Sequence, residues 1–97
     1  MASDTSQTPG DDQLALYHFE GCWYCHIVRD VIDELGIDVE LRNIFENRDW
    51  FDELVEARGR RTVPVLCITS ADGEEHWMPE SRDIIRYLRA TYSPSTV

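Results

Sequence analysis

The chain has 97 residues, the length of a single domain, and with 42% hydrophobic and 29% charged residues it has the composition of a globular protein. It carries 19 acidic and 9 basic residues, a formal net charge of -10, and every basic residue is an arginine. This balance excludes nucleic acid and anionic membranes as partners, because both require a dominant basic surface. The absence of lysine excludes lysine chemistry such as Schiff bases.

Residues 1–12 are polar and show no hydrophobic periodicity, so we expect them to form a flexible tail. No apolar run reaches the ~18 residues that a membrane-spanning helix needs. The N-terminus also lacks the basic and apolar parts of a signal peptide. The cytoplasm is therefore the expected compartment.

The folded domain is predicted to begin with a short apolar run, Gln13–Phe19, which is typical of a buried strand. After the next few residues, apolar side chains recur at helical spacing up to Leu35, and Gly36 is a natural end for that helix. Ile37–Leu41 then alternates apolar and polar residues, as a half-buried strand does. Together these elements predict a βαβ unit, whose two strands are normally parallel.

The second half of the chain predicts a helix, two strands joined by a tight turn, and a last helix that ends near Ser93. The helix is expected at about 49–57, the strands at 62–68 and 75–78, and the last helix from about 81. The predicted order is β-α-β-α-β-β-α, which indicates an α/β fold. The domain is expected to cover residues 13–92, followed by a short tail at 93–97.

A pair of cysteines, Cys22 and Cys25, lies where the first strand passes into the first helix. Side chains three residues apart share one face of a helix, so the two sulfurs are within disulfide reach. The dipole and free N–H groups at the helix N-terminus favour a thiolate at Cys22. We therefore expect Cys22 to be the nucleophile and the better shielded Cys25 to be the resolving thiol.

Two other interpretations of the pair stay open. A structural zinc site needs four ligands, but Cys67 and the histidines at 18, 26 and 76 do not have ligand spacing. The pair could also be two inert buried cysteines, although its position in a βαβ unit favours a redox role. Cys67 lies in an apolar run, where cysteine usually packs as a small hydrophobic residue.

The dipeptide Val63-Pro64 lies at the start of a predicted strand, and a proline there is ordinarily a strand edge. A cis peptide before Pro64 would instead leave the N–H and C=O groups of Val63 unpaired. Such groups can pair with a short extended peptide, as in strand addition. The sequence does not decide between these alternatives.

With these motifs the chain resembles the glutaredoxins, within the thioredoxin-like superfamily, from about Leu14 to Tyr92. The resemblance rests on Cys22-Trp23-Tyr24-Cys25, on Thr62-Val63-Pro64, and on Glu80-Ser81 with the apolar helix after it. Glu80-Ser81 and Tyr17-His18-Phe19-Glu20 are also similar to the glutathione-binding domain of glutathione transferases, whose all-helical second domain is not predicted within these 97 residues. The resemblance implies a thioredoxin-like fold with a four-stranded mixed sheet flanked by helices.

The resemblance also implies that glutathione binds beside a cis Pro64, with Val63 pairing with its backbone. By position, it implies that Cys22 is the nucleophile and Cys25 the resolving thiol. Ser81 is also a typical helix N-cap, a role compatible with binding a carboxylate at a helix N-terminus. The expected glutathione-binding residues are Tyr24, Arg60, Arg61, Val63, Pro64, Glu80 and Ser81, of which Glu80 and Ser81 hold the γ-glutamyl end.

Two departures from the glutaredoxin pattern bear on the ligand. Trp23 stands where the commonest motif has proline, and Phe19 stands where many members have lysine. The glycine carboxylate of glutathione must then find another cation. Arg58, Arg60 and Arg61 are the candidates, because they form the densest positive cluster and guanidinium suits carboxylates. They could equally be a solvated helix end that complements the helix dipole.

The predicted function is that of a glutathione-dependent thiol–disulfide oxidoreductase, which reduces protein disulfides and protein–glutathione mixed disulfides with glutathione as the reductant. The alternative implied by the family is a protein that binds and transfers a glutathione-ligated [2Fe–2S] cluster through Cys22. A thioredoxin-type reductase fed by a protein reductase is less favoured. The expected partners are glutathione and glutathionylated or disulfide-bonded client proteins. The chain is expected to be a monomer, and a dimer only if a cluster is bound.

Overall fold

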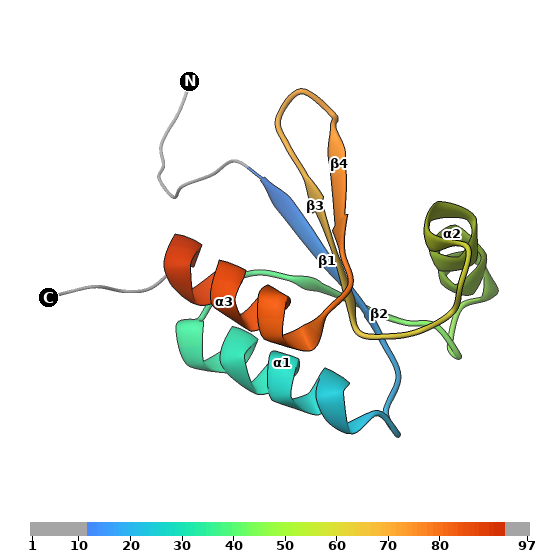
Figure 1. The fold of residues 1–97 in the computed structure, drawn as a ribbon, viewed down its shortest axis with the longest axis horizontal. Coiled ribbons are helices and arrows are strands. Elements are labelled where there is room, and N and C mark those ends of the chain that lie inside the picture. The colour runs from blue at the N-terminus through green and yellow to red at the C-terminus, as the bar shows by residue number, and fades with distance from the viewer. Residues whose placement is uncertain (1–11, 93–97) are drawn as a thin grey trace, which may run out of the picture.

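The computed structural model describes residues 12–92, and its elements follow the predicted order (Figure 1). They are β1 (Gln13–His18), α1 (Trp23–Leu35), β2 (Glu40–Asn43), α2 (Arg48–Arg58), β3 (Val65–Thr69), β4 (Glu75–Met78) and α3 (Ser81–Tyr92). Apart from Asp12, the tails predicted at 1–12 and 93–97 lie outside the described residues. Within the described part of the chain, no helix combines the length and the apolar character needed to cross a membrane.

The strands form one four-stranded sheet in the order β2-β1-β3-β4. β1 runs parallel to β2 and antiparallel to β3, and β4 is antiparallel to β3. The predicted mixed sheet is therefore confirmed. Figure 1 shows α1 and α3 side by side on one face of this sheet and α2 on the other.

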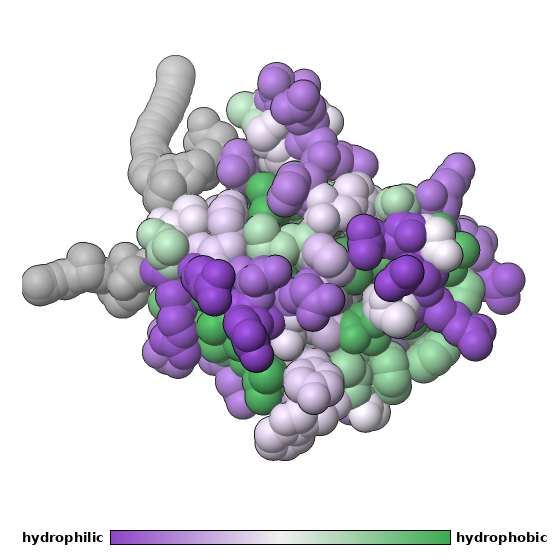
Figure 2. Space-filling model, in the orientation of Figure 1, coloured by the Kyte–Doolittle hydropathy of each residue, from purple (hydrophilic) through white to green (hydrophobic). Residues whose placement is uncertain are grey.

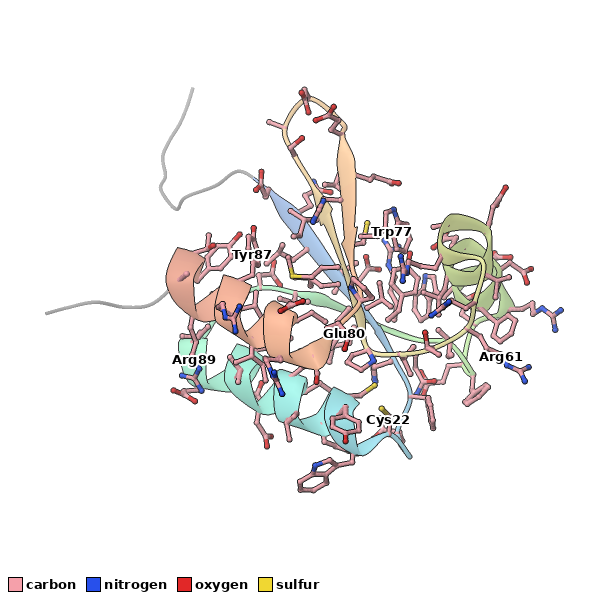
Figure 3. The ribbon with its side chains drawn as sticks, in the orientation of Figure 1. Cys22, Arg61, Trp77, Glu80, Tyr87 and Arg89 are labelled. Carbon is pink, nitrogen blue, oxygen red and sulfur yellow. The ribbon has the colours of Figure 1, made fainter. Side chains whose placement is uncertain are left out.

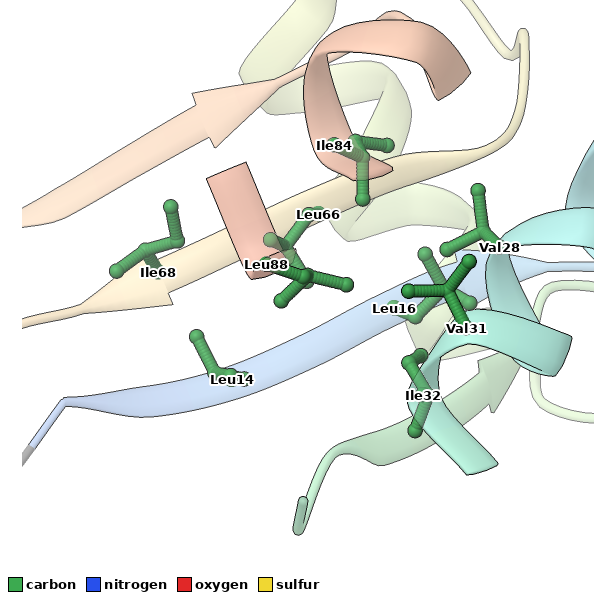
Figure 4. Close-up of a cluster of buried hydrophobic side chains, with 9 residues drawn as sticks. All are labelled: Leu14, Leu16, Val28, Val31, Ile32, Leu66, Ile68, Ile84 and Leu88. Atoms are coloured by element: carbon green, nitrogen blue, oxygen red, sulfur yellow. The ribbon is translucent and has the colours of Figure 1, made fainter. Parts of the chain in front are cut away.

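Each face of the sheet has its own core, because successive side chains of a strand point to opposite faces. Leu14 and Leu16 of β1 pack with the inward residues of α1 and α3 (Figure 4). Ala15 and Tyr17 of the same strand belong to the cluster under α2, where Leu54 is fully buried. Cys67 is 4% exposed in this second cluster, which confirms its predicted role in packing.

The structure corrects the bounds of two predicted strands. The strand expected at 37–41 corresponds to β2, but β2 starts later, because its ladder with β1 begins at Glu40 and ends at Asn43. Ile37 and Val39 pack against the core from the preceding connection instead. The strand expected at 62–68 corresponds to β3, but its first residue paired with β1 is Val65. Pro64, directly before it, has no N–H group to donate to the ladder.

Two glycines end the helices on which the site depends. Gly36 follows α1 with a φ of 67°, and Gly59 follows α2 with a φ of 71°. Both are in the left-handed region, which glycine adopts without a steric penalty. Gly59 donates its N–H to the Val55 carbonyl at 2.7 Å, so the chain leaves α2 toward Pro64 at a fixed point.

Candidate functional site

Cys22 is the N-cap residue of α1, with an extended backbone. Its sulfur accepts a hydrogen bond from the backbone N–H of Cys25 at 3.2 Å. The first turn of α1 contains no acidic residue, so the positive end of the helix dipole acts on this sulfur unopposed by a local carboxylate. The sulfur is half-buried and therefore accessible to a substrate. This is the environment in which a cysteine acts as a nucleophile.

Cys25 lies one turn into α1 and is 0% exposed. The pKa of the Cys25 thiol is raised to about 12, mainly by burial and to a smaller extent by a side-chain hydrogen bond with Cys22. Cys25 is therefore a neutral thiol at physiological pH. The structure thus brings the two cysteines together with the unequal shielding that the sequence predicted.

Val63 lies across from Cys22. The Cys22 thiol donates a long hydrogen bond to the Val63 carbonyl at 3.8 Å. The peptide bond between Val63 and Pro64 is cis, as the resemblance implied. Val63 precedes the first paired residue of β3, so its backbone is outside the sheet ladder and faces the cysteine site.

A cavity of about 620 Å³ extends from Val63 to the start of α3. All the residues predicted to bind glutathione line it except Arg61, namely Tyr24, Arg60, Val63, Pro64, Glu80 and Ser81. Arg61 is exposed and lies apart from Cys22 and Glu80 in Figure 3. A cavity of about 680 Å³ also exists, but it lies beside Gly36 at the far end of α1, away from both cysteines.

Arg58 also lines the cavity beside Val63, together with Arg60 and Arg82. The Nε atom of Arg58 is buried and has no hydrogen-bond partner in the described part of the protein. A buried unpaired donor is costly, and an anionic ligand in the cavity would satisfy it. The sequence indicated Arg58 only as one member of an arginine run.

The other end of the cavity is the N-terminus of α3. The helix begins at Ser81, and the Glu80 carbonyl accepts the Ile84 N–H at 2.8 Å. Ser81 is therefore the first residue within the helix, which corrects its interpretation as the N-cap. Free N–H groups in this first turn attract carboxylates, while the Glu80 side chain attracts an amine.

His18 and His26 lie close to the cysteine pair in the sequence, and no hydrogen bond joins either side chain to Cys22 within the described residues. His18 is 3% exposed, and burial lowers its pKa below the ordinary value, so it is neutral at pH 7. The Nε2 atom of His26 lies 2.6 Å from the carbonyl oxygen of Glu20, to which it donates. The Nδ1 atom of His18 is buried without a hydrogen-bond partner among the described residues, and the His26 ring contacts Glu20, so neither ring is positioned as a base for Cys22.

Sequence reasoning missed one feature beside Cys22, a pair of aromatic rings. The rings of Phe19 and Phe45 meet edge to face with their centroids 5.1 Å apart. Phe45 belongs to the connection between β2 and α2, and no spacing rule links it to the cysteines. Only the parallel pairing of β2 with β1 brings it there.

Within residues 12–92, no three His, Cys, Asp or Glu side chains are grouped closely enough to hold a metal ion. Of the three cysteines, which are all free, only Cys22 is not buried. The described side chains of one chain therefore offer a single accessible thiol to any metal centre.

Comparisons with known proteins agree with this geometry. The family model of the glutathione S-transferase N-terminal domain matches residues 16–96. No curated protein sequence gives a significant match. The matches to transferases bear out one of the two resemblances found in the sequence, while the resemblance to glutaredoxins rests on the sequence motifs alone.

Solved structures share the thioredoxin-like fold. The trimeric glutathione transferase TDR1 of Leishmania has a TM-score of 0.68 and 28% identity, over 84% of this chain and 18% of that chain. Maleylacetoacetate isomerase from Anaeromyxobacter dehalogenans, solved with GSH in its active site, has a TM-score of 0.66 and 25% identity, over 89% of this chain and 41% of that one. This chain therefore corresponds to less than half the length of either protein.

Proposed function

The chain belongs to the glutathione S-transferase N-terminal domain family, and from this premise we propose that it is a glutathione-dependent thiol–disulfide oxidoreductase. It reduces protein–glutathione mixed disulfides and protein disulfides. The observation that carries the proposal is Cys22, an accessible sulfur at a helix N-terminus that faces the backbone of Val63. A cysteine in this place can exchange disulfides with a bound glutathione, whereas a site for binding alone needs no sulfur.

Glutathione is proposed to lie in the 620 Å³ cavity with its cysteinyl backbone paired to Val63. Its glycine carboxylate binds Arg58, whose buried Nε lacks a partner among the described residues, with Arg60 beside it. Its γ-glutamyl carboxylate lies at the N-terminus of α3, and its amino group lies near Glu80. Three anchor points along the tripeptide place its sulfur toward Cys22.

The reaction consists of two disulfide exchanges. The Cys22 thiolate attacks the glutathione sulfur of the mixed disulfide and forms a new S–S bond with it. The bond between glutathione and the client breaks, and the client sulfur leaves as a thiolate that takes a proton from water. A second glutathione thiolate then attacks the glutathione sulfur on Cys22, so that glutathione disulfide leaves and the Cys22 thiolate is restored.

Burial makes Cys25 a slow competitor in the second step. A thiol with a pKa of about 12 has a very small thiolate fraction at pH 7, and the rate of exchange depends on that fraction. We therefore assign the regeneration of Cys22 to glutathione. Cys25 resolves those intermediates, such as a mixed disulfide with a client protein, that glutathione reaches poorly.

The cluster alternative has less support. A [2Fe–2S] cluster held by two chains would take Cys22 from each and two further ligands from glutathione, and no observation on the described residues favours such an arrangement. The proposed partners remain glutathione and its client proteins. The proposed compartment is the cytoplasm, because an enzyme restored by glutathione needs a reducing environment.

The test is the reduction of cysteine–glutathione mixed disulfide by glutathione, followed through the formation of glutathione disulfide. We expect Cys22→Ser to abolish turnover, because the exchange has no other accessible sulfur. Cys25→Ser should retain most of it and serves as the matched control within the same turn of α1. Unchanged turnover in Cys22→Ser would exclude the proposed reaction.

A further inference from the structure

Large aromatic side chains gather on the surface around Cys22. Among residues 12–92, the exposed large hydrophobic side chains are Trp23, Tyr24, Phe45 and Leu41. Trp23 and Phe45 are 71% and 70% exposed, and Figure 2 shows pale and green residues, not purple ones, along the lower edge where α1 begins. We call Phe19, Trp23, Tyr24 and Phe45 the aromatic rim.

The aromatic rim is joined to the backbone of the nucleophile. The Phe19 carbonyl accepts the Cys22 N–H at 3.3 Å. The Phe19 ring covers Gly21 so closely that a Cβ there would lie 3.1 Å from the ring. Phe45 packs edge-on against this ring. The rim therefore extends from α1 through Cys22 to the connection after β2.

Phe45 is held in its exposed position by a defined turn. The side chain of Asn43, which is 7% exposed, accepts the Phe45 N–H at 2.9 Å. The Asn43 carbonyl accepts the Glu46 N–H at 3.0 Å, and the intervening Ile44 is 4% exposed and anchors the turn in the core. An ordered aromatic side chain loses little conformational entropy when it binds a partner.

The charge around the aromatic rim selects the partner. Glu20 and Glu46 directly follow Phe19 and Phe45 in the sequence. Glu20 pairs with Arg29 at 3.2 Å, whereas Glu46 makes none of the ion pairs formed by the described residues. A cavity of about 240 Å³ beside Phe45 is lined by Glu46, by Arg48 and by apolar side chains. Arg48 is paired with Asp52 at 3.1 Å, so Glu46 is the charge on this lining that has no ion-pair partner among the described residues. In a chain with a net charge of -10, this surface favours an apolar segment that carries positive charge.

We propose that the aromatic rim is the docking surface for the client, a protein segment whose glutathionylated cysteine is flanked by an apolar side chain and by a lysine or arginine. The inference rests on the proposed function, which assigns the glutathione half of the substrate to the cavity beside Val63. The client half is attached to that glutathione through one disulfide bond, so every bound substrate brings it to the surface around Cys22. Apolar contact with Phe45 and charge contact with Glu46 then select among clients.

The experiment compares glutathionylated peptides of equal length with cysteine–glutathione mixed disulfide. One peptide carries leucine and lysine next to the modified cysteine, a second carries serine and lysine, and a third carries leucine and glutamate. We expect kcat/KM for the first peptide to exceed that for each of the others about tenfold, the effect of one well-buried apolar contact or one favourable charge contact. The preference for lysine over glutamate should shrink as the salt concentration rises.

Two matched variants assign this preference to the rim. Phe45→Ser should reduce the advantage of the leucine peptide over the serine peptide to less than about threefold. Leu41→Ser, which removes an exposed side chain on β2 away from Cys22, should leave that advantage unchanged. Circular dichroism checks that both variants are folded.

The outcomes separate the two proposals. Equal kcat/KM for all three peptides, with cysteine–glutathione disulfide still reduced, would overturn the docking surface and leave the proposed function standing. No reduction of cysteine–glutathione disulfide would overturn the proposed function and the inference with it. A dimer at assay concentration that Phe45→Ser converts to a monomer would assign the rim to a second copy of the chain and overturn the inference.

Discussion

The sulfur of Cys22 lies 3.8 Å from the carbonyl oxygen of Val63, although 41 residues separate them in the sequence. The contact forms because β1 and β3 are antiparallel neighbours in the sheet. The end of β1, which leads to Cys22, and the start of β3, which follows Val63-Pro64, therefore lie at the same end of the sheet. The helix end at Cys22 supplies a reactive sulfur, and Val63 supplies a backbone able to hold a peptide. Neither segment forms the site alone.

The unequal shielding of the cysteines predicts how they react with iodoacetamide. In the native protein at pH 7.5 we expect one alkylated thiol per chain, at Cys22, because Cys25 and Cys67 are buried and burial raises the pKa of both. Mass spectrometry of the intact protein counts the labels. Cys22→Ser should take up none until it is unfolded in urea, and rapid labelling of native Cys25 would contradict its assigned shielding.

The same burial predicts a loss of stability at alkaline pH. The pKa of Cys25 rises from an ordinary 9.0 to about 12 in the folded state, so between these values the unfolded chain loses a proton that the folded chain keeps. The free energy of unfolding should therefore be unaffected by this group below pH 9 and fall as the pH rises toward 12. Urea unfolding at several pH values measures the slope, which Cys25→Ala should make shallower. An identical slope in that variant would contradict the prediction.

Local patterns were sufficient to predict the element order and the cysteine site. Both the helix that ends at Gly36 and the position of Cys22 and Cys25 at its start can be recognised from residues close together in the sequence. The structure contains both features. The strand expected at 37–41 was misplaced because the ladder between β1 and β2 starts only at Glu40. Alternation at Ile37 and Val39 signals burial, but it does not set the register of a strand.

The residues that the sequence left undecided are those whose role depends on the path of the chain. Arg58 and Arg61 belong to one arginine run, yet Arg58 lies in the last turn of α2 and lines the cavity, whereas Arg61 follows the turn at Gly59 and is exposed. Phe45 was missed for the same reason, since only sheet pairing brings it to Phe19. Composition identifies a cluster of charge, and the direction of each side chain comes from the fold.

Arg58 and Arg61 therefore make a matched pair of variants for glutathione binding. Arg58→Gln should raise KM for glutathione about tenfold, because a charge-assisted hydrogen bond in a partly exposed cavity is lost, while kcat changes little. Arg61→Gln removes the same charge outside the cavity and should leave KM within about twofold. Calorimetry with S-methylglutathione provides an independent affinity. Equal effects of the two substitutions would mean that only the net charge matters and that Arg58 makes no specific contact.

Leu54 is a residue of α2, and its burial packs this helix, which ends at Arg58, against the sheet. Leu54 is 0% exposed and belongs to the cluster on the α2 face of the sheet, separate from the core under α1 and α3. Leu54→Ala should lower the free energy of unfolding by about 2–5 kcal/mol, and it should raise KM for glutathione because α2 packs less firmly. Leu14→Ala is the control, because Leu14 lies in the other core and lines the cavity beside Gly36, away from the cysteines and from the N-terminus of α3. It should cost a similar free energy in urea unfolding and leave KM nearly unchanged, whereas an equal rise in KM for both variants would show that the effect is general destabilisation.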